Sequence, residues 1–324
     1  MFRSIIGLNW KKSPAHLIFL SKFRTPRNIE EISLQDYWRD VLNEKPLKAV
    51  NRFIKDGMLI EGDVHSCMEY KFKVSELKQL LKERGLKQSG RKAEIIARLV
   101  ENDPEEMKKT VSGLKIYKCS SAGLEIAEEY LESEAEKRAL AEKNTISLLQ
   151  KRKFKQASMV VASYEAEQVF PRGIGIDWEN HDTSTDERIL SNVFNKFPKI
   201  LTGLEKDKLE PLRIVAGMMW LWGTNKRGAW IDDGFVTGIR FDATTSARMI
   251  WFHAKYLIDI EDYKQTKFFK KVGISGVNDE FVCMECRKII GKNFNLKQVP
   301  ELPHVKCTSE MGCRCTTIVG FDLE

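Results

Sequence analysis

The chain has 324 residues, 42% of them hydrophobic and 31% charged, so it has room for about two or three domains and is too apolar to be wholly disordered. Its net charge is +7, and its longest apolar run, Ile214–Trp222, is far shorter than the roughly 18 residues of a membrane span. Lys11 and Lys12 lie between two short apolar patches, which is the wrong order for a signal peptide. These features exclude a membrane-spanning protein, and we expect a cytoplasmic one.

The N-terminal stretch alternates turn signals with short apolar runs. Two short helices are expected over Asp36–Leu42 and Leu47–Lys55, and the small apolar stretch Met58–Ile60 follows them. This order suits a winged-helix-like element. We therefore expect an α-rich N-terminal domain over residues 1–65.

Most of the excess positive charge lies in one segment, Lys71–Val100. It holds nine basic and three acidic residues, a net charge of +6, whereas Glu101–Gln150 has a net charge of −4. Apolar residues recur at helical spacing on both sides of Gly85-Leu86, which predicts two short amphipathic helices joined by a loop. Such a concentration of cations on a small hairpin favours a polyanionic partner.

The second predicted helix of this hairpin begins close to Ser89-Gly90, where a short polar or Cβ-free residue satisfies the free amides of the first turn. Arg91 and Lys92 follow at once, and Lys78 and Lys82 lie one turn apart on the first helix. Free amides and cations on one surface describe a phosphate-binding site. The candidate phosphate contacts are Lys78, Lys87, Ser89, Gly90, Arg91 and Lys92.

At these residues the sequence resembles a SAP domain, the helix-loop-helix DNA-binding module of eukaryotic chromatin proteins and of bacterial and phage proteins. The resemblance rests on Val74–Lys78, Leu81, Gly85-Leu86, Ser89–Lys92, Glu94 and Arg98-Leu99. It implies a helical module, here residues 66–104, that binds double-stranded DNA through its phosphates with low sequence specificity. It also suggests a protein of bacterial or phage type.

The central part of the chain is expected to form a helical domain over residues 105–277. Gly123–Phe170 has the composition of a long helix, with a break expected at Asn144–Ser147. Further helices are expected over Glu187–Phe197, Lys208–Trp222 and Ser246–Tyr263. The apolar faces of this region could bind a protein partner.

Five of the seven cysteines fall within 33 residues near the C-terminus, and the first two, Cys283 and Cys286, have the C-x2-C spacing of a metal knuckle. The expected ligands are Cys283, Cys286, Cys307 and Cys313, with Cys315 or His304 as alternatives. Four such ligands fill a tetrahedral shell, which indicates structural zinc. We expect a small zinc-stapled β module over residues 278–324.

Taken together, the patterns predict a mainly α, multidomain protein in which a SAP-like hairpin tethers a helical, zinc-stapled body to DNA. Acidic residues around Asp177 and Asp182, with Asp232-Asp233, leave a metal-dependent nuclease as an alternative. A phage structural or defence factor is another. His253 lies among aromatic residues on an apparent core helix and is interpreted as a packing residue. With no catalytic residues to name, we expect a binding protein rather than an enzyme.

Overall fold

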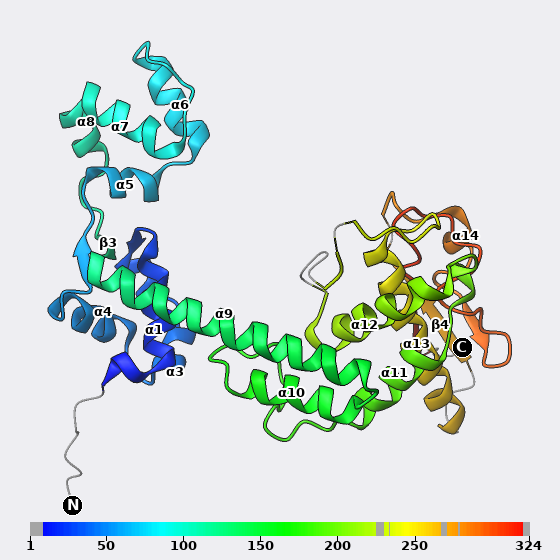
Figure 1. Ribbon diagram of the computed structural model, residues 1–324. Coiled ribbons are helices and arrows are strands. Elements are labelled where there is room, and N and C mark those ends of the chain that lie inside the picture. The colour runs from blue at the N-terminus through cyan, green and yellow to red at the C-terminus, as the bar shows by residue number, and fades with distance from the viewer. Residues whose placement is uncertain (1–8, 225–229, 233, 267–270, 278, 320–324) are drawn as a thin grey trace, which may run out of the picture. The chain divides into compact units, whose positions relative to one another are not determined.

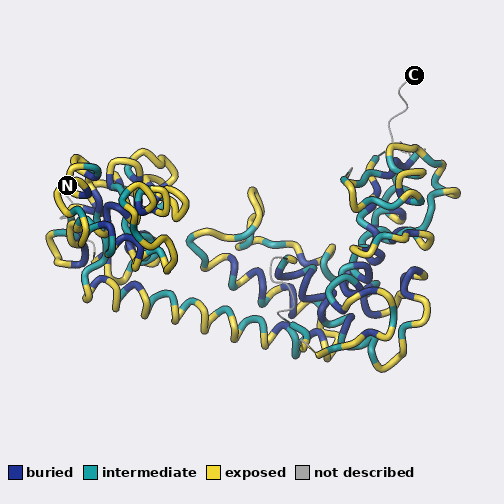
Figure 2. Tube along the Cα trace, turned by 90° about the horizontal axis from the view of Figure 1, so that it is seen from above, coloured by how far each residue is buried: buried dark blue, intermediate teal, exposed yellow. Residues whose placement is uncertain are grey.

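The computed structural model describes residues 9–224, 230–232, 234–266, 271–277 and 279–319 (Figure 1). The chain divides into two compact units, Met1–Lys137 and Arg138–Glu324, and the division falls inside one long helix, α9 (Ser121–Gln150). Figure 2 shows the buried residues gathered inside each unit. Helices dominate and the sheets are small, so the predicted mainly α fold class is confirmed. Among the described residues, no helix is both long and apolar enough to cross a membrane.

The first unit begins with a layer of short helices. Its elements are η1 (Trp10–Lys12), α1 (Pro14–Ser21), η2 (Lys22–Arg24), α2 (Ile29–Ser33), α3 (Tyr37–Leu42) and α4 (Pro46–Lys55). The buried ring of Phe19 lies 4.7 Å from that of Trp38 and 6.1 Å from that of Phe53, centroid to centroid. Both helices expected between residues 36 and 55 are present as α3 and α4. They pack around this aromatic core.

A three-stranded antiparallel sheet ties this layer to the segment that follows it. Its strands are β1 (Arg27–Asn28), β2 (Leu59–Glu61) and β3 (Ile116–Cys119), with β3 in the middle. Because β2 and β3 lie on either side of residues 62–115 in the sequence, the sheet brings the two ends of that segment together. The intervening helices are thereby held as one group (Figure 1).

That group contains the predicted basic hairpin. Its helices are α5 (Val64–Lys71), α6 (Val74–Glu83), α7 (Lys92–Asn102) and α8 (Pro104–Thr110). The apolar stripes of α6 and α7 form a separate core with α5 and α8, made by Leu77, Leu81, Ile95, Ile96 and Leu99 together with Met68 and Met107. Pro104 opens α8 directly after α7 ends at Asn102, as the proline predicts.

Helix α9 corrects the sequence interpretation. The break expected at Asn144–Ser147 is wrong, because α9 continues to Gln150. Thr145 is fully buried, and its hydroxyl donates to the carbonyl oxygen of Ala141 at 2.8 Å, so the helix itself satisfies this polar side chain. The chain turns instead at Arg152, which adopts a left-handed conformation with φ of 59°.

The second unit is built on helices that pack against one another. They are α10 (Phe154–Ala166), α11 (Ser184–Asn195), α12 (Lys206–Trp222) and α13 (Ala243–Gln265). The last three lie where helices are expected from apolar spacing, and those predictions are confirmed. His253 on α13 is buried and its Nδ1 hydrogen-bonds the carbonyl oxygen of Leu302 at 2.8 Å, in agreement with a packing role.

The C-terminal part adds a second three-stranded antiparallel sheet and one short helix. These elements are β4 (Lys271–Ser275), α14 (Met284–Arg287), β5 (Asn293–Asn295) and β6 (Thr316–Val319), with β4 in the middle of the sheet. Four of the cysteines are buried in the same apolar core as α11, α12 and α13: Cys286, Cys307, Cys313 and Cys315. The cysteine-bearing segment therefore packs directly against the helices of this unit.

Candidate functional sites: a basic hairpin and a cysteine cluster

Helix α6 separates an apolar face from a basic one. Leu77 and Leu81 are fully buried, whereas Lys78 and Lys82, each one residue further along, are exposed. Glu76 accepts a hydrogen bond from the amide of Lys73 at 2.5 Å, which satisfies one of the free donors at the start of the helix. The helix ends at Glu83, and Gly85 follows its cap residue Arg84 with a left-handed φ of 67°.

Arg98 shapes the loop between the two helices from the side of α7. Its Nη1 donates to the carbonyl oxygen of Lys87 and, at 3.2 Å, to that of Ser89. Arg84 adds an ion pair with Asp103 at 3.1 Å, which joins the start of the loop to the end of α7. The loop thus has a defined path even though Lys87, Ser89 and the residue between them are exposed.

The start of α7 differs from the expectation. Ser89 and Gly90 do not cap the helix; Arg91 occupies the capping position, and Glu94 accepts a hydrogen bond from the Arg91 amide at 3.1 Å. Gly90 has a φ of 131°, which L side chains rarely adopt, and a Cβ there would lie 2.7 Å from the Glu94 carboxylate, so this position favours glycine. The sequence does contain a signal for this cap, because Glu94 lies three residues after Arg91, the spacing of a carboxylate that reaches back to the capping residue.

The predicted phosphate contacts lie on the surface of this hairpin. Lys78, Lys87, Ser89, Gly90 and Arg91 are exposed. Lys92 is half-buried, and its Nζ donates to the carbonyl oxygen of Glu69 on α5 at 2.6 Å. Within the described part of the chain, none of these lysine or arginine side chains forms an ion pair. Their charge is therefore available to a ligand.

The cysteine cluster begins at the N-terminus of α14. Cys283 caps this helix, and its sulfur accepts hydrogen bonds from the amides of Cys286 at 3.5 Å and Thr308 at 3.3 Å. Burial raises the pKa of the Cys283 thiol, but these N–H donors outweigh it and lower the pKa to about 6. A thiolate stabilised by backbone amides is the usual ligand in a metal knuckle.

The remaining cysteines converge on the first pair by chain reversal. The sulfur of Cys283 lies 3.7 Å from that of Cys307, and the sulfur of Cys286 lies 3.9 Å from that of Cys313. The candidate ligand groups among the described residues are Cys283, Cys286 and Cys307, and Cys286, Cys313 and Cys315. The two groups share Cys286, and within each group the three sulfurs lie within 4.8 Å of one another, close enough to hold a metal ion.

His304 enters this cluster through its backbone. Its amide donates to the sulfur of Cys313 at 3.2 Å, while its ring is absent from the ligand groups found in the described residues. Sulfhydryl donation from Cys286 and Cys307, the main cause, lowers the pKa of Cys313 despite burial. Cys313 therefore resembles Cys283 in having its thiolate stabilised by donors.

The acidic loops of the second unit serve local structure. Asp177 accepts from the side chain of Asn180 at 3.0 Å and from its amide at 3.1 Å, and Asp182 accepts from the amide of Ser184 at 2.9 Å. These bonds lower the pKa of both carboxyls. The metal-ligand groups in the described ranges are made of cysteines, and Asp233 lies outside those ranges. Among the described residues, no carboxylate cluster therefore supports the metal-dependent nuclease alternative.

His181, within the same acidic stretch, belongs to a hydrogen-bond network around Asp186. That carboxylate accepts from His181 Nε2 at 2.9 Å, from the Ser158 hydroxyl at 2.5 Å and from the Trp220 indole at 2.8 Å. Serine and histidine both bond to the carboxylate and not to each other, which is not the geometry of a nucleophile with its general base. The network joins α10, α11 and α12.

Comparison with known proteins supports the hairpin. Residues 71–104 match the SAP domain family, which covers α6, α7 and the loop between them, about a tenth of the chain. The SAP domain is a general DNA-binding module. No curated protein and no solved structure matches the chain.

Proposed function

We propose that this protein binds double-stranded DNA through the phosphates that meet the loop and first turn of α7, and that it does so with low sequence specificity. The observation that carries the proposal is the exposed loop at residues 87–91, held open by Arg98 and bearing cations without acidic partners in the described ranges. Phosphate contacts give affinity without reading bases.

The start of α7 indicates which groups supply the binding energy. Glu94 already accepts the Arg91 amide, and its negative charge offsets the positive end of the helix dipole. Binding must therefore depend on the side-chain cations of Lys78, Lys87, Arg91 and Lys92. Such binding releases counterions from DNA and weakens steeply as salt is added.

We further propose that the second unit is stapled by one structural zinc ion. Its ligands are Cys283, Cys286, Cys307 and Cys313, with Cys315 or His304 as the alternatives for one position. The short sulfur–sulfur distances and the N–H donors to Cys283 and Cys313 support thiolate ligation. Four protein ligands leave no coordination site for water, so the zinc would hold structure and not catalyse a reaction.

In this function the SAP module tethers the helical second unit to DNA. A reducing compartment such as the cytoplasm would keep the clustered thiols available to metal. A protein partner on the central helices and a bacterial or phage setting remain predictions from the sequence.

The test is a duplex titration across salt concentrations with the variant Arg91→Glu/Lys92→Glu. Loss of about two phosphate contacts should weaken binding and reduce the slope of log affinity against log salt by about 2. The matched control is Lys108→Glu/Lys109→Glu, which makes the same charge change at exposed positions of α8.

A second variant separates folding from binding. Lys92 also bonds to Glu69, whereas Lys87 and Arg91 are exposed at the loop, so Lys87→Glu/Arg91→Glu leaves the bond of Lys92 intact. It should weaken duplex binding in the same way. Unchanged affinity and salt slope in both loop variants would refute the site.

A further inference from the structure

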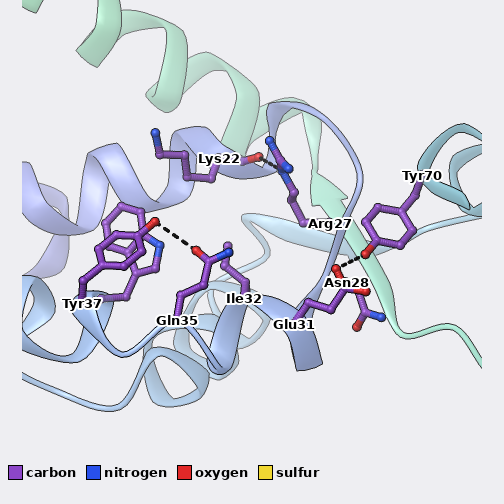
Figure 3. Close-up of a pocket in the computed structure, with 9 residues that line it drawn as sticks. Lys22, Arg27, Asn28, Glu31, Ile32, Gln35, Tyr37 and Tyr70 are labelled. Atoms are coloured by element: carbon purple, nitrogen blue, oxygen red, sulfur yellow. Dashed lines mark hydrogen bonds between the residues drawn. The ribbon is translucent and has the colours of Figure 1, made fainter. Parts of the chain in front are cut away.

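A polar pocket of about 280 Å³ lies in the first unit, next to the SAP module (Figure 3). It is lined from η2, β1, α2, α3 and α5. This volume is close to the lower end of the range of small-molecule pockets, about 300 Å³, so a ligand the size of one nucleotide is the upper limit and a duplex is too large.

Four side chains offer hydrogen-bond donors at this pocket. Among the described residues, Arg27 donates only through its Nε, to the carbonyl oxygen of Lys22 at 3.2 Å, and Lys22 forms no ion pair. Asn28 and Gln35 each use their amide oxygen, to accept from Glu30 and from Tyr37, which leaves their NH2 groups as donors. Cationic and amide donors together suit a phosphate with an attached polar group.

The carboxylate at the pocket, Glu31, is engaged. The hydroxyl of Tyr70 donates to it, as Figure 3 shows. Burial and this bond raise the pKa of Tyr70 to about 12, so the hydroxyl keeps its proton. The lining therefore has two cations against one hydrogen-bonded anion, a balance that favours an anionic ligand.

An aromatic surface completes the pocket. Tyr37 is 50% exposed, and its ring centroid lies 5.1 Å from that of the buried Trp38. Figure 3 shows the Tyr37 hydroxyl directed toward Gln35, which fixes the orientation of the ring. A fixed, half-exposed tyrosine beside cations is a stacking platform for a nucleobase.

Helix α5 connects this pocket to the SAP loop. Tyr70 is on the pocket wall, and its neighbour Glu69 accepts the hydrogen bond from Lys92, the first residue of α7. Two adjacent residues of one helix thus contact the pocket and the proposed phosphate site. A DNA strand held at one site has only a short distance to the other.

We propose that this pocket binds one unpaired nucleotide of a DNA strand whose duplex part is held by the SAP module. The phosphate lies against Lys22 and Arg27, and the base stacks on Tyr37. The inference rests on the proposed function and deepens it, because it makes a junction between duplex and single strand the preferred ligand.

The test compares a blunt duplex with the same duplex carrying a short 5′ or 3′ single-stranded overhang, using fluorescence anisotropy and the full chain. Tyr37→Ala should weaken binding of one overhang substrate by about tenfold, the effect of losing one stacked base, and leave blunt-duplex binding unchanged. Tyr37→Phe keeps the ring and should stay within about twofold of wild type. Arg27→Ala should resemble Tyr37→Ala, and Arg39→Ala, an exposed arginine outside the pocket, should not.

A second measurement does not depend on any variant. An iododeoxyuridine in the overhang should cross-link, on irradiation, to the peptide that contains Tyr37. Equal affinity for blunt and overhang DNA together with no such cross-link would overturn the proposal. So would saturable binding of the free nucleotide dTMP without any preference for overhang DNA, since the pocket would then serve a free nucleotide.

The two proposals fail in different ways. Arg91→Glu/Lys92→Glu should weaken binding of both substrates, whereas the Tyr37 variants act on the overhang alone. If the loop variant leaves blunt-duplex binding intact, the SAP site is wrong while the overhang comparison still tests the pocket.

Discussion

Arg98 contributes to the proposed DNA contact by shaping the loop and not by meeting a phosphate. Arg98 is half-buried, and its Nη1 donates hydrogen bonds to two carbonyl oxygens, those of Lys87 and Ser89. A planar guanidinium can hold two acceptors at fixed angles, which an ammonium group cannot do equally well. The residue therefore sets where the neighbouring cations lie.

We predict that Arg98→Lys, which preserves the charge, weakens duplex affinity several-fold without changing the salt slope. The slope reports the number of phosphates neutralised, and that number is unaltered if Arg98 touches none. Lys82→Arg, a charge-preserving change on the exposed face of α6, is the control. A reduced salt slope in Arg98→Lys would instead make Arg98 a phosphate contact.

At the scale of elements, the cysteine cluster depends on short segments with little regular structure. The turn of α14 supplies Cys283 and Cys286, and the chain from residue 307 to the start of β6 supplies the others. Amide donors stabilise the thiolates of Cys283 and Cys313 in this arrangement. A bound zinc ion would join these segments, since binding free energy at such a site is folding free energy.

We predict one zinc per chain by elemental analysis, and its loss in Cys283→Ser and Cys307→Ser. Cys67→Ser, in the first unit, is the control and should keep the metal. Cys315→Ser and Cys313→Ser decide the fourth ligand: with Cys313 as the ligand, only Cys313→Ser loses zinc. Retention in both, with loss in His304→Ala, would point to the histidine, and a wild-type protein without zinc would contradict the site.

At the scale of the whole molecule, the two proposed sites belong to different units with separate apolar cores. The hairpin core is made within residues 64–116, whereas the cysteines are buried in the core of the second unit. No residue contributes to both of these cores. Loss of order at one site should therefore leave the other intact.

We accordingly predict that a strong chelator lowers the melting temperature of the second unit while duplex affinity changes by less than about twofold. Each unit has its own core, and cooperative units can unfold separately. Calorimetry and a duplex titration on the same chelated sample make the measurement. A parallel loss of DNA binding would show that the metal site supports the DNA contact.

The sequence by itself determined the features that depend on neighbouring residues. Periodicity located α6 and α7, Pro104 marked the end of α7, and the C-x2-C spacing singled out Cys283 and Cys286, which share a group with Cys307, because helical faces and turn residues are local properties. The candidate phosphate contacts were also selected from local sequence, and most of them are exposed in the structure.

Tertiary structure decided what distant groups do to one another. Helix α9 continues through Thr145, whose buried hydroxyl bonds to the carbonyl oxygen of Ala141, and Arg98 reaches back across the SAP loop to bond with its carbonyl oxygens. The pocket at Tyr37 needs Tyr70, which lies on another helix. Contacts of this kind arise from packing between segments far apart in the chain, which no local pattern of apolar or charged residues encodes.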